Sequence, residues 1–435
     1  MRKTISIVLL LLLLLLLALA SAAIIYLLQA DTNSRQQDTS KPRSSAQQAG
    51  TLHQPYKPTP EPAFTDISQP WFQGASGIWG ATGRDDKGHI WLGVSGSGNT
   101  SAHLVEYNPE LNSFVDHGDP VSALKAAGIY RKGEEQIKIH SKIIQMNDGW
   151  LYFASMDETG ERGDGSQLPL WGSHFWRYKP SAGRWEHLFS APEGLIAVSG
   201  VGRWVYALGY WGHVLYQHDT MTGKTTHIRV GSEGGHISRN LVADGNGHVY
   251  VPRVKYYGLD ARQDIEATAT DRLLVVMLVE YDQFLQKLQS TPLIYYATKG
   301  KPGASHGITS FSYLADGTIV FGTHVGHLYR ITPSDQGPAA VSELGWLHPE
   351  GESYNPALFP LDGKRYLAGI TKRHGKGYQL FRYDIEQRKS QPLELVIPDY
   401  HPLLLYGSNT RDNEGRGYIV GRRDGKRPVI FQMKF

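Results

Sequence analysis

The chain has 435 residues, of which 40% are hydrophobic and 20% charged, with 48 glycines and no cysteine. The glycine content is too high for a helical bundle and lacks the collagen period. The absence of cysteine excludes disulfides, Fe–S clusters, Cys-ligated zinc and a thiol nucleophile. After residue 50 the basic and acidic residues balance at 39 each, so no nucleic acid is expected as a partner.

The N-terminus carries a segment typical of exported proteins. Arg2 and Lys3 precede an unbroken run of apolar or small residues from Ile7 to Leu28, 22 residues long. A membrane span needs about 20 such residues, whereas the core of a signal peptide has about 7–15. We therefore favour an uncleaved signal anchor over a removed signal peptide for residues 1–28. In both cases the basic residues predict that the remainder is exported to the periplasmic or extracellular side.

Residues 29–70 are rich in Gln, Ser, Thr and Pro and show no hydrophobic periodicity. This composition predicts a disordered tether. The folded domain is predicted to be residues 71–435, and the membrane would be contacted through the N-terminal helix only.

A repeat organises the sequence after the tether. A short apolar strand is followed by an Asp/Gly turn and then by a second strand rich in Trp, Tyr, Val and Ile. Asp-Gly and Asn-Gly sequences supply the positive φ that tight hairpins need. The turns are Asp85-Asp86-Lys87-Gly88, Asp148-Gly149, Asp244-Gly245-Asn246-Gly247, Asp316-Gly317, Asp362-Gly363 and Asp412-Asn413-Glu414-Gly415, with a weaker seventh copy at Gly202-Arg203.

Seven copies in the predicted domain give repeats of about 50 residues. Four-stranded repeats of about 40–50 residues are typical of a β-propeller, whose radial packing leaves only short, protected edges. We therefore predict an all-β fold, a seven-bladed β-propeller, with six or eight blades as the alternatives. A β-sandwich would not repeat one turn seven times, and the repeats of a β-helix are much shorter.

The propeller topology assigns each motif to one of two rims. The start of each innermost strand and the turn between strands two and three share one rim and line the central funnel, whereas the Asp/Gly turns lie on the opposite rim. His140 and His236 each lie eight residues before a turn aspartate, so both should open an innermost strand. Polar side chains gathered at a propeller axis favour a ligand site. The other funnel candidates are His306, Asn355 and Asn409 at innermost strands, and His103, His174, Tyr210, His213, His324, His327, Lys372, Arg373 and His374 at second turns.

Several histidines also have structural interpretations. A histidine recurs at the head of the third strand, at His103, His174, His213 and His327, and a hydrogen bond that closes the turn is the alternative role for these four. His89 and His248 follow Asp/Gly turns and are expected on the surface of the opposite rim, without a function.

The sharpest local motif is GGHISRN at residues 234–240. Two glycines permit close backbone approach, and imidazole, guanidinium and amide groups follow within a few residues. Strand alternation puts His236, Ser238 and Asn240 on one face and Arg239 on the other. The Arg239 guanidinium suits a carboxylate or sulfate through a bidentate contact, and a bridge between two blades is its alternative role. A second basic cluster, KIHSK, surrounds His140.

Other reaction classes lack their motifs. No glycine-rich loop follows a strand and opens a helix, so no nucleotide is expected, and neither are haem and Fe–S cofactors. The GxSxG elbow of serine hydrolases is absent. Paired carboxylates, the signature of glycoside hydrolysis, are not evident in the funnel.

Five motifs resemble a known family. KIHSK with GWLYFASMDE, then GYWGH, then GGHISRN with GHVYVPR cover roughly Ile137 to Arg253. In this pattern the chain resembles the seven-bladed propeller polysaccharide lyases, the ulvan-lyase kind most of all and oligogalacturonide lyases more distantly.

The resemblance implies roles for particular residues. His140 and Tyr210 would carry the acid–base work and Arg239 would neutralise a uronate carboxylate, with His174 and His236 assisting. The implied cofactor is a divalent metal (Zn, Mn or Ca), for which His236 and His324 are the candidate ligands. The predicted substrate contacts are His174, His213, Ser238, Asn240, His306, Asn355, Lys372 and Arg373.

The resulting hypothesis is an exported polysaccharide lyase that cleaves a uronate-containing polysaccharide, sulfated or unsulfated, by β-elimination. Elimination needs a base of near-neutral pKa, an acid for the leaving oxygen, and positive charge at the carboxylate. Two alternatives stay open: a non-catalytic propeller that binds a carbohydrate or protein at the membrane surface, and a metal-dependent propeller hydrolase.

Overall fold

The computed structural model describes residues 63–69, 71–162, 167–209, 214–232, 238–257, 273–296, 307–395, 397 and 402–435. These residues form β-strands almost throughout, with one α-helix, α2 (Pro120–Ala126), and one short 3-10 turn (Pro180–Ala182). The predicted signal anchor and most of the predicted tether lie outside the described residues. Within the described part of the chain, no helix has the length and apolar character needed to cross a membrane.

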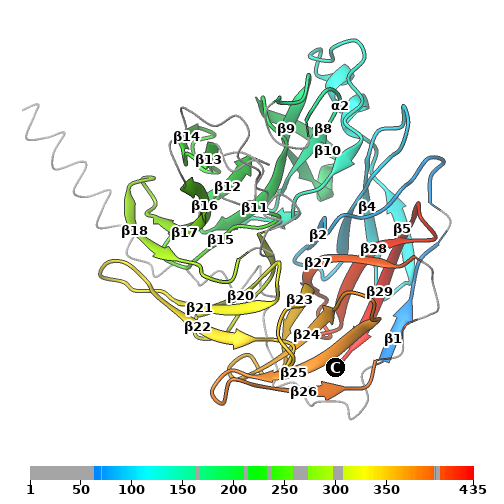
Figure 1. Ribbon diagram of the computed structural model, residues 1–435. Helices are drawn as coiled ribbons and strands as arrows, with labels where there is room; N and C mark the ends of the chain where they lie inside the picture. Colours follow the sequence, from blue (N-terminus) through cyan, green and yellow to red (C-terminus); the bar gives the residue numbers. More distant parts are fainter. Residues whose placement is uncertain are drawn as a thin grey trace, which may run out of the picture. The chain divides into compact units, whose positions relative to one another are not determined.

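Six sheets follow one another along the chain (Figure 1), and the eight-stranded one contains two blades, so the described strands form seven four-stranded blades. The blades are numbered in chain order. Blade 1 contains β2 (Thr82–Arg84), β3 (Ile90–Val94), β4 (His103–Asn108) and β5 (Ser113–Asp116), and blade 2 contains β6 (Lys138–Ile139), β7 (Ile144–Gln145), β8 (Leu151–Asp157), β9 (Gly172–Lys179) and β10 (Arg184–Ala191). Blade 3 contains β11 (Leu195–Val201), β12 (Trp204–Gly209), β13 (Val214–Asp219) and β14 (Thr225–Arg229). In blade 2 both β6 and β7 pair with β8, so two short strands share the innermost position.

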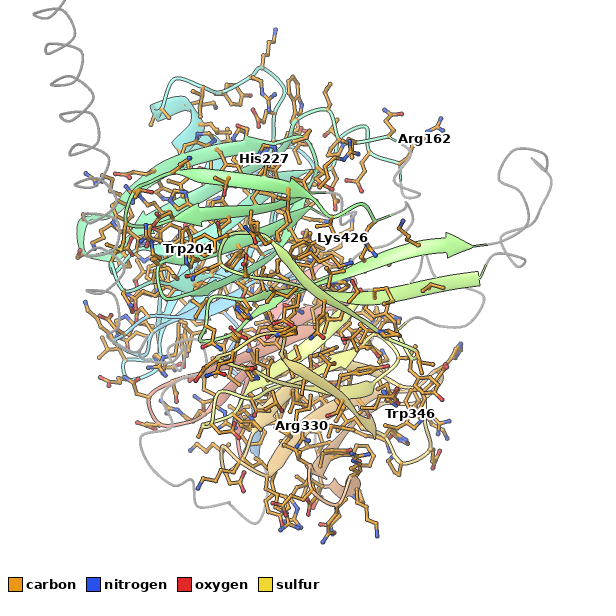
Figure 2. The ribbon with its side chains drawn as sticks, turned by 90° about the vertical axis from the view of Figure 1, so that its left-hand side faces the viewer. Arg162, Trp204, His227, Arg330, Trp346 and Lys426 are labelled. Carbon is orange, nitrogen blue, oxygen red and sulfur yellow. The ribbon has the colours of Figure 1, made fainter. Side chains whose placement is uncertain are left out.

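Blades 4 to 7 repeat the arrangement. Blade 4 contains β15 (Val242–Ala243), β16 (Val249–Tyr257), β17 (Leu273–Tyr281) and β18 (Lys287–Pro292), and blade 5 contains β19 (Ile308–Tyr313), β20 (Ile319–Thr323), β21 (His327–Thr332) and β22 (Ala340–Trp346). Blade 6 contains β23 (Tyr354–Pro360), β24 (Tyr366–Lys372), β25 (Tyr378–Asp384) and β26 (Lys389–Leu393). Blade 7 contains β27 (Leu404–Arg411), β28 (Gly417–Arg423) and β29 (Arg427–Lys434). Within each blade neighbouring strands are antiparallel, and one parallel bridge joins β23 to β27. The long strands β16 and β17 of blade 4 run out past their neighbours in Figure 2.

The last blade is completed by a strand from the N-terminal side. β1 (Ala63–Asp66) pairs antiparallel with β29 and forms the outermost strand of blade 7. Phe64 of this strand packs on Phe431, with the ring centroids 4.4 Å apart. The predicted boundary at residue 70 is therefore too late. A lone four-residue strand, without the hairpin turn that marks the other strands, gave no signal in the sequence.

Apolar side chains fill the space between each pair of neighbouring blades. The buried residues form seven clusters, each joining two consecutive blades, and one of them joins blade 7 to blade 1. In that cluster Tyr418 and Val420 of β28 pack with Ile90 and Leu92 of β3. Strands such as β3 and β8 are buried along their whole length, because their two faces meet two different neighbours. The ring is closed, and the predicted seven-bladed propeller is confirmed.

The Asp/Gly turns lie between the first and second strands of the blades, as predicted. The turn of blade 4 shows what the aspartate does. One oxygen of Asp244 accepts the backbone N–H groups of Asn246 and His248, and the other accepts the Tyr250 hydroxyl at 2.6 Å. Gly247 has a φ of 83°, a conformation that glycine adopts without strain. The bond from an aromatic side chain to the turn aspartate recurs in Trp91–Asp85, Tyr152–Asp148 and Tyr418–Asp412.

Two turn aspartates form a matched pair for a stability test. Asp244 is fully buried, and its removal would leave a hydroxyl and two N–H groups without their acceptor. Asp316, in the equivalent turn of blade 5, is exposed and accepts the Thr318 N–H. We expect Asp244→Ala to lower the free energy of unfolding by about 2–4 kcal/mol and Asp316→Ala by less than about 1 kcal/mol. Urea unfolding of both variants measures the difference, and equal losses would contradict this account of the turn.

Candidate functional site

A small cavity lies where segments that lead into the innermost strands meet. It is lined by Trp79 and Gly80 before β2, His140 and Lys142 between β6 and β7, Arg239 and Asn240 before β15, and Gly407 of β27. These segments come from blades 1, 2, 4 and 7. The cavity therefore lies at the centre of the ring, and its described lining holds an arginine, a lysine and a histidine but no carboxylate.

The centre of this cavity is a direct contact between two residues that the sequence singled out. Arg239 Nη1 lies 3.1 Å from His140 Nε2. Because a guanidinium can only donate, Nε2 is the acceptor and the His140 ring carries its proton on the other nitrogen. The same Nη1 approaches the Trp79 carbonyl at 3.4 Å. Arg239 therefore connects blade 4 to blades 1 and 2. This is the structural role, a bridge between blades, that the sequence suggested as its alternative.

Aromatic side chains surround the guanidinium. Cζ of Arg239 lies 5.0 Å from the centre of the Tyr406 ring, and the Trp79 ring packs on Tyr406 with centroids 4.6 Å apart. On another side, the His324 and Tyr354 rings are 5.5 Å apart. Burial, and then the charge of Arg239, lowers the pKa of His324 to about 4, so this imidazole is neutral near pH 7.

Three buried donors around the cavity lack a protein partner. They are Arg239 Nε, Trp79 Nε1 and the Tyr354 hydroxyl, none of which has a hydrogen bond within the described residues. Buried donors are normally satisfied, so this concentration of unsatisfied ones favours a ligand that accepts hydrogen bonds. Burial raises the pKa of Tyr354 to about 12, and its phenol therefore keeps its proton near neutral pH.

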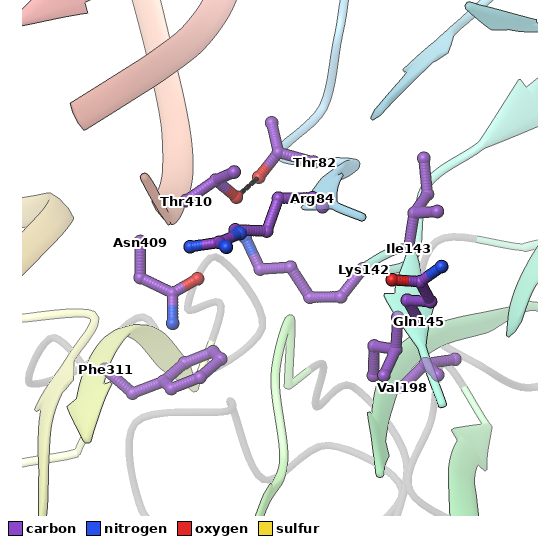
Figure 3. A pocket seen from close by; sticks show the side chains of 11 residues that line it. Thr82, Arg84, Lys142, Ile143, Gln145, Val198, Phe311, Asn409 and Thr410 are labelled. Atoms are coloured by element: carbon purple, nitrogen blue, oxygen red, sulfur yellow. Dashed lines mark hydrogen bonds between the residues drawn. The ribbon is translucent and has the colours of Figure 1, made fainter. Parts of the chain in front are cut away.

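Lys142 lies between this cavity and a second pocket on the axis. Its Nζ donates to the carbonyl oxygens of Gly80 at 2.9 Å and Gly407 at 2.6 Å. The second pocket is lined by side chains from five blades, and Figure 3 shows Lys142 extending across it from the blade 2 side toward Asn409 and Thr410 of β27. Burial, followed by the charge of Arg239, lowers the pKa of Lys142 to about 7.

The depressed pKa of Lys142 predicts a rise of stability with pH. Between about pH 7 and 10.5 the unfolded chain binds this proton and the folded chain does not, so raising the pH favours the folded state. We expect the unfolding free energy of the native chain to increase from pH 7 to pH 9 relative to that of Lys142→Met. Urea unfolding of both proteins at the two pH values measures this difference. Identical pH dependence would show that Lys142 keeps its ordinary pKa.

Ser238 and Asn240 bond to blade 5, whereas Arg239 bonds to residues of blades 1 and 2. All three precede β15 and lie outside any strand, so the predicted strand alternation does not apply to them. The Ile308 N–H donates to Ser238 Oγ at 3.3 Å, and Asn240 Nδ2 donates to the Ile308 carbonyl at 2.9 Å. Both side chains are buried. They join the segment that carries Arg239 to β19 of blade 5, although Asn240 also lines the cavity.

The other described candidates lie outside the cavity lining. His174 is buried, with Nε2 2.6 Å from Glu134 and Nδ1 2.9 Å from His187. These contacts fit the structural role considered for a histidine at the head of the third strand. Lys372 approaches the Leu403 carbonyl at 3.3 Å. Arg373 forms an ion pair with the exposed Glu350.

Of the remaining predicted site residues, Asn355 is described by the structure and four others are not. Asn355 of β23 is fully buried, and its neighbour Tyr354 meets His324 instead. The predicted residues Tyr210, His213, His236 and His306 lie outside the described residues. Of the predicted catalytic set, the structure therefore brings together His140 and Arg239, and of the predicted metal ligands it describes only His324.

Four residues that line the cavity or lie beside it were not selected from the sequence, although two of them left a signal. Tyr354 lies eight residues before Asp362, the spacing that identified His140. Lys142 belongs to the KIHSK cluster, two residues after His140. Trp79 and Tyr406 lie six residues before their turn aspartates, because the segments that lead into blades differ in length, and the spacing rule missed them.

Two groups of carboxylates and histidine could hold a metal ion. They are Asp85, His89 and Glu106 in blade 1, and Asp244, His248 and Glu280 in blade 4. His89 and His248 are not the free surface residues that the sequence suggested, because each is half-buried against a glutamate. Among the described residues, His324 belongs to neither group.

The chain matches no protein-family model and no curated protein. Solved structures do share its fold. The WD40 repeats of RRP9 give a TM-score of 0.51 at 10% identity, over 87% of this chain and 99% of that chain. U3-55K gives 0.50 at 10% identity, over 86% and 99%. A PL25 ulvan lyase bound to -[GlcA(1-4)Rha3S]- gives 0.50 at 9% identity, over 83% and 95%. These similarities show a β-propeller fold that a polysaccharide lyase shares with WD40 proteins.

Proposed function

We propose that this protein is an exported polysaccharide lyase that binds a uronate at the Arg239–His140 cavity and cleaves the chain by β-elimination. The observation that carries the proposal is the set of buried, unpartnered donors around Arg239 in a cavity whose described lining has no carboxylate. Such a site complements a carboxylate. A carboxylate in the substrate is also what makes the neighbouring C–H acidic enough to lose its proton.

Arg239 would neutralise the uronate carboxylate. A guanidinium presents paired donors that match the two carboxylate oxygens, and Arg239 Nε has no protein partner. As the proton leaves, negative charge spreads onto the carboxylate, so contacts to Arg239 strengthen in the transition state. Trp79 Nε1 offers a further donor next to it.

His140 would act as the base. Its Nε2 accepts from Arg239, which keeps this nitrogen unprotonated and directed into the cavity. A carboxylate that takes over the Arg239 donors would release the Nε2 lone pair next to the substrate. His140 then removes the proton α to the carboxylate, the electron pair forms the C=C bond, and the bond to the glycosidic oxygen breaks.

A tyrosine would protonate the departing oxygen. The family resemblance gives this role to Tyr210, which lies outside the described residues. Within the described part of the chain, Tyr354 has a buried, unpartnered hydroxyl, and burial raises its pKa to about 12. A phenol that stays protonated near neutral pH suits an acid rather than a base.

A non-catalytic carbohydrate-binding propeller is the second candidate. The aromatic rings of Trp79 and Tyr406 beside Arg239 favour it, since aromatic faces and a cation can hold a sugar acid without cleaving it. Three measurements on the full-length chain with uronate polymers separate the candidates. The lyase forms an ultraviolet-absorbing unsaturated product, a hydrolase forms reducing ends without that absorbance, and a binding protein retains the intact polymer. We expect the ultraviolet product, and either other outcome would reject the lyase.

A further inference from the structure

A cluster of metal-ligating side chains lies in blade 1 and shares no residue with the cavity. Asp85 comes from the β2–β3 turn, His89 directly precedes β3, and Glu106 lies on β4. One ligand atom from each lies within 4.8 Å of the other two. Asp85 Oδ2 is 3.6 Å from His89 Nδ1, and Glu106 Oε1 contacts the same nitrogen.

These distances suit one tetrahedral ion. Ligand atoms about 2.0–2.2 Å from zinc lie about 3.3–3.6 Å from one another, which matches the separation of Asp85 and His89. Glu106 has to move back slightly from the imidazole to admit the ion. Its side chain and that of His89 are 16% and 21% exposed, so an ion can reach them from solvent.

Hydrogen bonds from neighbouring residues hold each ligand in orientation. Glu106 Oε2 accepts from His117 Nε2 at 2.7 Å, and His117 Nδ1 faces the Tyr178 hydroxyl at 2.8 Å. Asp85 Oδ1 accepts two backbone N–H groups at 2.9 and 3.0 Å, and Oδ2 accepts the Trp91 indole N–H at 3.0 Å, which fixes the carboxylate and leaves the second lone pair of Oδ2 for the ion. The other nitrogen of His89 meets the Asn108 amide at 3.1 Å. Outer contacts of this kind set the tautomer and direction of metal ligands.

The equivalent group in blade 4 shows the contrast. Glu280 accepts bonds from His248, from the Ala339 N–H and from Gln289, on both of its oxygens. Its side chain is 1% exposed. Those protein donors saturate Glu280, so the blade 4 group serves as an internal hydrogen-bond network. The repeat therefore holds one closed copy and one open copy of the same Asp–His–Glu arrangement.

We propose that Asp85, His89 and Glu106 of blade 1 bind a single Zn²⁺ ion. One imidazole with two carboxylates fits zinc better than calcium or magnesium, which prefer oxygen ligands alone. The ion would link the turn before β3 to β4 and so stabilise blade 1. This inference does not depend on the proposed lyase activity.

Isothermal titration of the chelator-treated, full-length chain, without a polyhistidine tag, tests the site. We expect one Zn²⁺ per chain in the native protein and at least a tenfold weaker affinity in His89→Ala. His248→Ala, the matched change in blade 4, should leave the affinity unchanged. His117→Phe should weaken binding about 10–100-fold, because Glu106 loses the hydrogen bond that orients it toward the ion. Zn²⁺ should also raise the melting temperature of the native chain and not that of His89→Ala.

Two results would overturn the proposal. One is binding of equal affinity and stoichiometry in the native chain and in His89→Ala, which would place the ion elsewhere. The other is tighter binding of Mn²⁺ or Ca²⁺ than of Zn²⁺ at this site, which would refute zinc. If His89→Ala does not fold, Glu106→Gln, which keeps the shape of the side chain, carries the same test.

Discussion

Replacing Arg239 by alanine should lower the rate of uronate polymer cleavage by about 10²–10³-fold, because the variant loses the donor that stabilises charge developing on the carboxylate. The guanidinium contacts His140 and Tyr406 directly, so its loss acts at the reacting group. Initial rates of ultraviolet product formation measure the effect. Arg239→Lys should recover only part of the rate, since an ammonium cannot make the paired contact.

The matched control for this experiment is Arg365→Ala. Arg365 forms its ion pair with Asp384 next to the blade 6 Asp/Gly turn, on the rim away from the cavity. We expect native activity from this variant. An Arg239→Ala protein that folds normally and keeps more than a tenth of the native rate would show that Arg239 does not take part in the reaction.

Removing β1 should destabilise the propeller by at least about 3 kcal/mol. A fragment of residues 71–435 loses the pairing of β1 with β29 and the packing of the partly buried Phe64 on Phe431, so strand hydrogen bonds and buried apolar area disappear together. It also loses the ion pair of Asp66 with Arg423 at 3.2 Å. The bare edge of β29 would then be open to pairing between molecules.

A fragment of residues 60–435 is the control, since it retains β1. We expect it to unfold cooperatively in urea and to elute as a monomer, whereas the 71–435 fragment unfolds at a lower midpoint and aggregates. Equal midpoints and elution volumes would show that blade 7 is stable with three strands.

The fold could be predicted because one local feature repeats. Each Asp/Gly turn specifies a hairpin through its own backbone geometry, and the buried aromatic a few residues later, such as Tyr250 or Tyr418, hydrogen-bonds back to that aspartate. Both signals lie within a few residues of each other in the sequence. β1 has no such turn, and its partner β29 lies at the other end of the chain, so its pairing could not be foreseen.

The candidate site could be predicted only in part. The spacing to the turn aspartate correctly placed His140 at the axis, and the same spacing applied to Asp362 would have given Tyr354 instead of Asn355. Trp79 and Tyr406 meet beside Arg239 from segments of other lengths, so their convergence follows from three-dimensional packing. The metal-ligating group of blade 1 needs Glu106 from a later strand. The sequence does not show that Glu106 lies beside Asp85 and His89, because only the pairing of β3 with β4 brings them together.

Cleavage in water enriched in ¹⁸O, followed by mass spectrometry of the products, tests the central claim most directly. β-Elimination breaks the chain without adding water, so we predict unsaturated uronate ends that carry no ¹⁸O. Hydrolysis adds one solvent oxygen at each break. Saturated ends that contain ¹⁸O, or a polymer that is bound but never shortened, would contradict the proposed role of Arg239 and His140.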